Sequence, residues 1–507
     1  MDAAIVTLAE RHWSQHAALP LLLPLQLLPV AGALLLLALR DKRWAEQLGR
    51  LFFAAELALA ILLYAGIDAT SPALQFAERF DLILYRVGAD GVTALFVMVA
   101  ALIGLLLSLY EPARDRMRHA ELLAVILLAQ AALMAMLATT NLVWFSAASA
   151  LELGLVAYLL RVWAAGDAGD LAYSRFLQYQ GFGLLLFVAG AVVLAWGHAD
   201  ATGGQWSFDL FDLVLTPPLG KFQAAAFFLL FYGLAVRTPL FPLHGWLPNM
   251  AQHGTIAIAP TLLLGVKVGI YGMVRFVLPL TPDAVIAWQP YVVAFAATGV
   301  FFTAALALLQ TNLRRLLAFA VVSHTSLIVI GLFTLHPLGV QGALLLAVNF
   351  GFAVTVLLLM VAFVYKRTQT AELAELGGLF ERIPFIAIAF LIGGFSIVGM
   401  PGTPGFDAAH LVLEAAIEHF GALPTVAAAL GNVAAAGFLL WAFQRAFLAP
   451  RPRDLPAARI ARTSRMEYLV GGATLLVLLA AGFYPEPWLQ LTDSATAALA
   501  EHFVHHE

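Results

Sequence analysis

The sequence predicts an all-α integral membrane protein with about 14 transmembrane helices. Of its 507 residues, 62% are hydrophobic and only 11% are charged, whereas a soluble domain is about 45–50% apolar and about 25% charged. A mean hydropathy of +0.89 indicates that lipid surrounds most of the chain. The net charge of −4 argues against a nucleic-acid-binding surface, and the absence of cysteine excludes disulfides and thiolate metal sites.

The predicted transmembrane helices account for most of the chain. A membrane-spanning helix needs about 20 mostly apolar residues, and 14 segments meet this requirement. They are residues 19–39, 51–67, 91–109, 120–139, 141–161, 177–196, 222–238, 256–277, 285–309, 316–335, 341–365, 383–400 with a continuation to about 420, 423–447 and 468–483. Little of the sequence is left for a soluble domain.

The distribution of Lys and Arg predicts the orientation. Of the 27 basic residues, 20 fall in the connections that follow segments 1, 3, 5, 9, 11 and 13. The positive-inside rule makes these connections cytoplasmic. We therefore expect a multi-pass protein of a bacterial-type inner (cytoplasmic) membrane, with both termini on the outer side.

Two of the predicted helices are interrupted. Segment 7 runs into three prolines between Arg237 and Pro248, and each proline removes a backbone donor. Segment 12 contains Gly399–Gly405, which includes two further prolines. Broken backbone at membrane depth persists only where it is buried in protein or lines a cavity, and paired breaks in two halves typically mark an ion path.

The positions of the two breaks predict the domain organisation. They occupy the fourth place in helices 4–8 and in helices 9–13, which indicates two inverted five-helix repeats. We expect residues 1–119 to form helices 1–3, residues 120–280 the first repeat, residues 281–450 the second repeat, and residues 451–507 helix 14 and a tail.

Charged side chains at the bilayer centre are the first candidate functional residues, because they are costly there and functional by default. Lys267 lies ~16 Å along segment 8, far from either interface, where it can exchange a proton. Glu152 lies at a similar depth in segment 5 and needs a cationic partner. Arg237, at the first break, is the candidate. A purely structural ion pair is the alternative for these two residues.

A row of titratable residues follows the second break. Asp407, His410, Glu414 and Glu418 stand at i, i+3, i+7 and i+11, which places them in one narrow stripe of a helix. Histidine titrates near neutral pH, so the stripe suits a proton relay. The alternative is that Asp407 caps the half-helix and Glu418 lies among the outer headgroups.

Three further histidines are candidates for admitting protons. His324 lies within segment 10, whereas His244 and His253 flank the first break. We expect no metal, because no two of these residues stand at ligand spacing with a carboxylate. We also expect no cofactor on this chain, because it carries no nucleotide-binding motif. Asn349 and Ser396 are interpreted as packing residues or as residues that line a file of water.

The sequence resembles the antiporter-like subunits of respiratory complex I and of multisubunit cation/proton antiporters. The segment Ala235–Pro248, AVRTPLFPLHGWLP, is similar to their proline-rich signature. Leu264–Phe276, Asn312–His324 and Gly399–Thr403 also match, and the resemblance spans roughly residues 90–450. Among these subunits, the sequence is most similar to the 14-helix subunit of complex I. It implies inverted five-helix repeats with broken helices 7 and 12.

The resemblance also implies roles for particular residues. Glu152 resembles the helix 5 glutamate, and Lys267 resembles the central helix 8 lysine. Arg237 stands where the family carries a helix 7 lysine, and Ala409 stands where helix 12 usually carries Glu or Lys. Asn249 replaces an acidic residue that commonly follows the Trp-Leu-Pro motif. These departures indicate a divergent member.

We therefore predict a subunit that conducts protons past Lys267 and is not catalytic alone. The expected partners are redox-arm or antiporter subunits, together with lipid and protons. One alternative is the membrane subunit of a complex that accumulates inorganic carbon, because some relatives pair with a large cytosolic zinc protein similar to carbonic anhydrase. A Na⁺/H⁺ antiporter subunit is a further alternative, and a structural anchor is a third.

Overall fold

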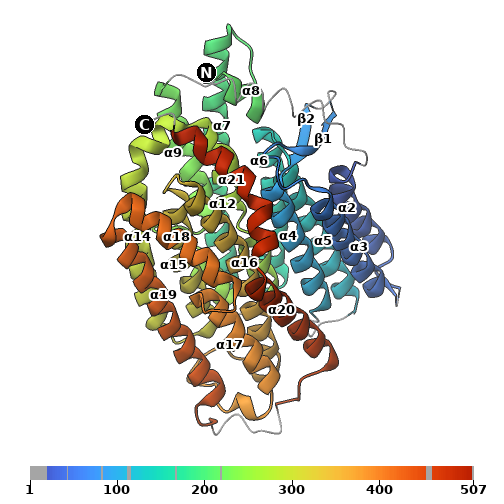
Figure 1. Cartoon of the computed structure of the whole chain (residues 1–507). Helices are drawn as coiled ribbons and strands as arrows, with labels where there is room; N and C mark the ends of the chain where they lie inside the picture. Colours follow the sequence, from blue (N-terminus) through green and yellow to red (C-terminus); the bar gives the residue numbers. More distant parts are fainter. Residues whose placement is uncertain are drawn as a thin grey trace.

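Long helices form nearly all of the computed structural model, and most of them run side by side (Figure 1). The structure describes residues 20–504, except for 43, 81–83, 111–115, 166–167, 217–219 and 453–459. The two chain ends, which were predicted to face the outer side, therefore lie outside the described residues.

Each predicted transmembrane segment coincides with helical structure. The first half contains α2 (Leu22–Ala38), α3 (Ala45–Gly66), α4 (Gly91–Leu109), α5 (Arg116–Ala138), α6 (Leu142–Val162), α7 (Gly169–Thr202), α8 (Leu210–Leu215), α9 (Gly220–Arg237), α10 (Leu247–His253), α11 (Ile258–Leu264), α12 (Val268–Gly272), the π-helical segment η2 (Met273–Val277) and α13 (Leu278–Leu280). The short α8 and α10 lie between the predicted spans.

The second half has the same character. It contains α14 (Pro282–Leu308), α15 (Leu313–Leu332), α16 (Pro337–Thr368), the short 3₁₀ turn η3 (Leu379–Glu381), α17 (Pro384–Val398), α18 (Pro404–Phe420), α19 (Ala422–Phe443), the π-helical η4 (Gln444–Leu448), α20 (Arg465–Phe483) and α21 (Glu486–Val504).

Within the described residues, 11 helical segments are long and apolar enough to cross a membrane. Two shorter apolar helices, α2 and α17, accompany them. The most buried are α15, α16 and the segment Ile258–Leu280, so the core of the bundle lies along these three. Of the residues that the sequence predicts for the proton path, Lys267 lies within the segment Ile258–Leu280 and His324 lies on α15.

Polar side chains fix where several helices begin. Asn141 accepts hydrogen bonds from the backbone N–H groups of Val143 and Trp144 at the start of α6, at 2.9 and 3.4 Å. Asn312 does the same for Arg314 and Arg315 at the start of α15. These oxygens satisfy backbone donors that have no partner within the helix. Helices that carry candidate site residues therefore start at defined positions.

Both predicted interruptions are present, and there is a third. The backbone leaves the helical path between α9 and α10 and again between α17 and α18, where Gly399 and Gly402 have φ of 75° and 84°. The predicted continuous segment 8 is wrong, because α11 ends at Leu264 and α12 begins at Val268. Lys267 stands in this gap with φ −79° and ψ 63°.

The prediction of a purely α-helical chain misses a small sheet. Strands β1 (Gln75–Phe80) and β2 (Tyr85–Ala89) form an antiparallel hairpin between α3 and α4, at the same end of the molecule as α8 (Figure 1). The segment is short and polar, so the pattern of apolar runs did not reveal it. The hairpin is anchored by Tyr85, whose hydroxyl donates to Gln26 of α2.

The predicted C-terminal tail is also more ordered than expected, because it forms α21. This helix lies across α16 and α4. Gln341 of α16 donates to the carbonyl of Leu489 at 2.9 Å, and a Cβ on Gly91 of α4 would lie 1.7 Å from the carbonyl oxygen of Leu491. Apolar residues at intervals of four, from Leu491 to Phe503, were the available signal for an amphipathic helix.

Candidate functional site

A buried ion pair joins α6 to the end of α9. Arg237, the last residue of α9, donates through Nη2 to Glu152 Oε2 and through Nη1 to Ser149 Oγ at 2.9 Å. The side chains are only 8% (Arg237) and 1% (Glu152) exposed. Glu152 and Ser149 stand three residues apart on α6 and therefore share one face. The sequence-based pairing of Glu152 with Arg237 is confirmed as a contact.

Lys267 lies at the centre of the most buried part of the bundle. It occupies the break between α11 and α12, and its side chain is almost wholly buried. Its Nζ donates to Thr325 Oγ1 of α15 at 3.0 Å and lies 5.7 Å from the ring centre of Phe350. An ammonium group here has one hydroxyl acceptor and the face of an aromatic ring. Among the residues that the structure describes, no carboxylate is within ion-pair distance of it.

Two close approaches of backbone hold this lysine between the other site elements. A Cβ on Gly269 would lie 1.5 Å from Thr238 Oγ1 and 2.8 Å from the carbonyl oxygen of Leu234, so α12 packs directly on the end of α9. A Cβ on Gly351 would lie 2.0 Å from the carbonyl oxygen of Gly265, so α16 packs on the end of α11. The absence of side chains at these points brings the Arg237 and Lys267 breaks together.

Polar residues continue from Lys267 towards the second break. The His324 ring stacks on Phe350 with centroids 4.4 Å apart, and its Nδ1 lies 3.1 Å from the Ala320 carbonyl. Beyond Phe350, Asn349 Oδ1 accepts from Ser396 Oγ at 2.8 Å, two residues before the end of α17. The structure therefore brings His324, Asn349 and Ser396 to the same side of Lys267 as the α17–α18 break.

His244 and His253 flank the first break as predicted. His244 is buried beside the rings of Phe241 and Phe319. His253 ends α10, and the carbonyl of the next residue, Gly254, accepts from Arg314 Nη2 at 3.0 Å. Arg314, one of the basic residues that the sequence assigns to a cytoplasmic connection, has a buried guanidinium that ties the end of α10 to α15.

The predicted stripe on α18 does not line the interior of this chain. His410 and Glu414 are 71% and 45% exposed, with His410 Nε2 3.8 Å from Glu414 Oε2, and Glu418 is also exposed. The buried face of α18 carries small and apolar residues instead, including Ala409. A stripe at this spacing has one defined face, and here that face points outward. The proton relay that the sequence predicts for these residues is therefore not enclosed by the described part of this chain.

Asp407 is partly buried at the end of the same stripe. It lines an almost entirely apolar cavity of about 270 Å³, together with residues of α3, α4, α16, α20 and α21. Asp407 and His410 both lie on α18, but Asp407 borders this cavity whereas His410 is exposed.

Two charged groups inside the bundle had no role in the predicted path. Arg275, which the sequence places inside segment 8, lies in the π-helical η2 and donates to Asp90 Oδ1 and to Thr93 Oγ1, both at 2.8 Å. Glu56, in the middle of α3, is completely buried. The criterion that identified Glu152, an acid in the middle of an apolar segment, applied equally to Glu56 and was the available signal.

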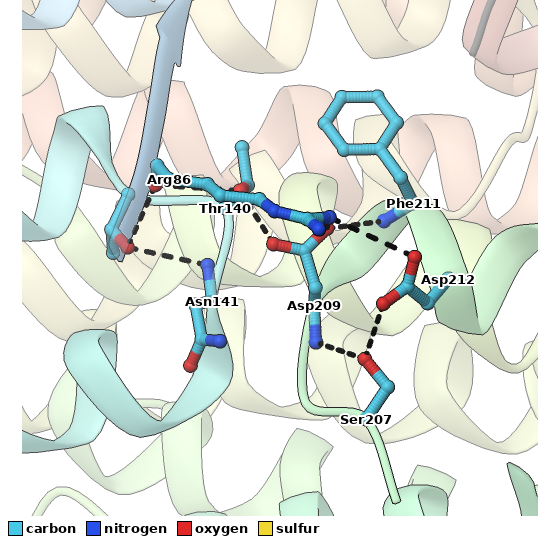
Figure 2. A network of polar contacts seen from close by, with 8 residues as sticks. Arg86, Thr140, Asn141, Ser207, Asp209, Phe211 and Asp212 are labelled. Atoms are coloured by element: carbon cyan, nitrogen blue, oxygen red, sulfur yellow. Dashed lines mark hydrogen bonds and ion pairs between the residues drawn. The ribbon is translucent and has the colours of Figure 1, made fainter. Parts of the chain in front are cut away.

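A polar cluster outside the spans positions the start of α6 (Figure 2). Arg86 of β2 lies 3.2 Å from Asp209 Oδ1 and 3.7 Å from Asp212 Oδ1, and its carbonyl accepts from the Thr140 backbone N–H. Thr140 Oγ1 also donates to Asp209 Oδ2 at 3.2 Å. Burial raises the pKa of Asp209, and the nearby guanidinium opposes this. The cluster thus connects the hairpin, the α5–α6 turn and α8.

Comparisons with known proteins identify the family of this chain. The model of a family described as NADH:quinone oxidoreductase/Mrp antiporter, TM, matches residues 150–435, which include most of the candidate site. The chain is 29% identical to NADH-quinone oxidoreductase subunit M of Mycobacterium tuberculosis, over 94% of this chain and 93% of that protein. It is 26% identical to F(420)H(2) dehydrogenase subunit M of Methanosarcina mazei, over 93% and 98%.

Solved structures show the same fold. A chain of respiratory complex I from Thermus thermophilus has a TM-score of 0.86 and 27% identity, covering 95% of this chain and 99% of that chain. A chain of the Mrp complex from Dietzia sp. has a TM-score of 0.83 at 18% identity, covering 96% and 98%, which shows the fold alone. The chain therefore belongs to the NADH:quinone oxidoreductase/Mrp antiporter transmembrane family, as an antiporter-like, proton-translocating membrane subunit of the complex I and Mrp type.

Proposed function

We propose that this chain translocates protons through its own core, by a path centred on Lys267, as a subunit of a larger assembly in a bacterial-type cytoplasmic membrane. The observation that carries the proposal is the placement of Lys267. Its ammonium is buried at a break in a helix, where its contacts are a hydroxyl and an aromatic face, and no described residue places an anion there to hold its proton permanently. A lysine in such a setting can release and regain a proton.

In the proposed architecture, 14 helices cross the membrane and helices 4–8 and 9–13 form two inverted repeats. The two apolar helices α2 and α17, which are shorter than the other spans, and α9 complete this set alongside the 11 longer segments. The domain boundaries proposed are those at 119, 280 and 450. Paired breaks at α9–α10 and α17–α18 support the repeat, since they occupy corresponding positions.

The proposed proton path enters beside His244 and His253 and reaches Lys267 at the centre. From there it continues along His324 towards Asn349 and Ser396, which border the second break. We assign the Glu152–Arg237 pair the role of biasing Lys267 electrically, because arginine keeps its proton and Gly269 packs α12 against the end of α9.

His410 and Glu414 remain the proposed outer exit, with Asp407 and Glu418 at the ends of the stripe. Because His410 and Glu414 are exposed on this chain, we place this exit where a neighbouring subunit covers α18. Charged groups at membrane depth face protein or a water-filled cavity, so they need such a neighbour.

The partners proposed are the other membrane and redox subunits of a complex I or Mrp-type assembly. The named relatives are subunits of respiratory or Mrp complexes, and they give no support to a carbon-accumulating complex or a zinc-containing partner. No metal or cofactor is assigned to this chain, and the choice of H⁺ over Na⁺ rests on the scarcity of oxygen ligands along the path.

The test is substitution of the central lysine in the intact complex in native membranes. We expect Lys267→Ala to reduce proton-coupled activity at least about tenfold, since a barrier increase of about 1.4 kcal/mol already has that effect. Lys221→Ala is the matched control, because Lys221 lies at the start of α9 beside Phe222 and away from the core. Full activity in Lys267→Ala, at an unchanged level of assembled complex, would exclude the proposed path.

A further inference from the structure

Glu56 is a buried acid that the central path does not use. It lies midway along α3, is 0% exposed, and neither carboxyl oxygen has a hydrogen-bond partner within the described residues. The other buried acids of the described residues have arginine partners: Glu152 pairs with Arg237, Asp90 with Arg275, Asp209 with Arg86 and Glu467 with Arg367. Glu56 therefore differs in kind from the acids that form ion pairs.

Two contacts align α3 with α5 and place Gln130 at the level of Glu56. His119 Nδ1 of α5 lies 3.2 Å from Glu46 Oε1 of α3, and a Cβ on Gly49 would lie 3.1 Å from Leu123 Cδ1. The two helices therefore run in the same direction. Seven residues beyond Gly49 and Leu123, about two turns along each helix, are Glu56 and Gln130.

A third helix confirms that Gln130 faces this seam. A Cβ on Gly104 of α4 would lie 2.0 Å from Gln130 Nε2 and 3.2 Å from a ring carbon of Phe53, which precedes Glu56 by one turn of α3. The glycine leaves room for the Gln130 amide between α3 and α4. Glu56 and Gln130 thus belong to one buried packing layer of α3, α4 and α5.

The Gln130 amide offers an acceptor that is not in use. Its Nε2 donates to the Ala100 carbonyl at 2.7 Å, whereas its buried Oε1 has no hydrogen-bond partner within the described residues. A carboxylate is acceptor-only, so it cannot satisfy this oxygen. A protonated carboxyl group has the O–H donor that the oxygen lacks.

The surrounding charges do not favour a carboxylate either. Of the helices packed against α3, α2 and α4 contain no titratable residue, and α21 contacts it through Trp488 at Tyr64, eight residues beyond Glu56. Asp407 of α18 lines the same cavity as Leu57, the neighbour of Glu56, and is itself an acid that offers no positive charge. On α5 the titratable residues Arg116, Arg118, His119 and Glu121 all lie at least nine positions before Gln130. Arg50 of α3 precedes Glu56 by six residues, which rotates it about 240° around the helix. An unpaired carboxylate in such surroundings costs several kcal/mol.

We propose that Glu56 is a proton-binding site, separate from the Lys267 path, which holds H⁺ as a neutral carboxyl group hydrogen-bonded to Gln130 Oε1. The ligand is the proton itself, and the site is made by α3 and α5 with Gly104 providing the space. It lies outside the segment that the family model matches, which begins at residue 150.

Infrared spectroscopy of the full chain, reconstituted in lipid vesicles, tests this site near neutral pH. Glu56→Gln keeps the size of the side chain and should remove a carbonyl-stretching band of a protonated carboxyl group. In Gln130→Leu the band should remain present but should lie at a higher frequency, because the hydrogen bond is lost. Glu121→Gln is the control and should leave the band unchanged, since Glu121 lies near the start of α5, where it accepts from Tyr158, and is nine residues from Gln130.

The outcomes separate the two parts of the proposal. If the difference between Glu56→Gln and the unaltered chain contains only the bands of an ionised carboxylate, Glu56 is not a proton-binding site at neutral pH. If the band is present but Gln130→Leu does not shift it, the assigned hydrogen bond is wrong. Activity of the central path enters neither readout, so failure here is distinguishable from failure of the Lys267 proposal.

Discussion

At the scale of single residues, the choice of arginine at position 237 changes what the buried pair can do. Its guanidinium binds both Glu152 and Ser149, which a compact ammonium does with less defined geometry. The guanidinium keeps its proton, so in the proposed path proton exchange falls to Lys267. The role proposed for the pair is that of a fixed electrostatic element that biases this lysine.

Removing one member of this pair should be more damaging than removing both. We expect Arg237→Met or Glu152→Met alone to lower the free energy of unfolding by about 3–5 kcal/mol, because each leaves an unpaired buried charge. The double variant should lose less than either single variant. Denaturation in detergent measures this, with Arg161→Ala as control, because the Arg161–Asp170 pair is exposed and worth about 0–1 kcal/mol. Additive losses would contradict a coupled pair.

Asp209 allows a prediction about pH outside the membrane-spanning segments. Burial raises the pKa of Asp209 above its ordinary value of 3.8. In the pH window between the ordinary and the raised pKa, Asp209 is therefore protonated in the folded state and ionised in the unfolded state. The contribution of this group to the free energy of unfolding is complete below that window and is lost as pH rises through the pKa of the folded state. Asp209→Asn should therefore gain stability relative to the unaltered chain as pH rises across the window.

Thermal unfolding at a series of pH values in detergent measures the difference. Asparagine also caps helices, so the contact with the Phe211 backbone N–H can persist in the variant. A stability difference that does not change with pH would show that Asp209 does not titrate differently in the folded protein.

At the scale of helices, interruptions rather than helix faces position the site. The breaks after Arg237 and before Pro404 follow from proline and glycine and were predictable from the sequence. The break at Lys267 was not, because no proline lies between Leu264 and Val268 and the cause is close contact of Gly265 and Gly269 with other helices. Likewise, the helical period predicted a common stripe for His410 and Glu414 but not that the stripe faces outward.

Gly269 should be sensitive to the smallest added side chain. Gly269→Ala places a methyl group against Thr238 and the backbone of Leu234, so α12 must move away from α9. We expect a loss of about 1–3 kcal/mol in the free energy of unfolding, with reduced proton-coupled activity although Lys267 is unchanged.

A matched glycine substitution provides the comparison. A Cβ on Gly154 of α6 meets nothing within 4 Å, so Gly154→Ala should be neutral or stabilise the protein by up to about 1 kcal/mol through helix propensity. Equal effects of the two substitutions on stability and activity would contradict the role assigned to the contact between α12 and α9.

At the scale of the whole molecule, composition and charge predicted most of the architecture. Scarce charge identified the membrane class, and the apolar runs identified the segments that became helices. The β1–β2 hairpin escaped because it is short and polar, and the periodicity of α21 was visible in the sequence although its docking through Gln341 to the Leu489 carbonyl was not. The burial of Arg314 escaped because a basic residue beside a loop ordinarily indicates a cytoplasmic surface.

The orientation of the whole chain is testable because the sequence contains no cysteine to remove first. Gln205, after α7, and Glu375, before α17, are both exposed and lie on opposite predicted sides. We expect a membrane-impermeant thiol reagent to label Gln205→Cys in intact cells and Glu375→Cys only in inside-out vesicles. The reversed pattern would place the basic connections outside and invert the proposed path. Labelling of both sites from one side would mean that an odd number of helices between α7 and α17 does not cross the membrane.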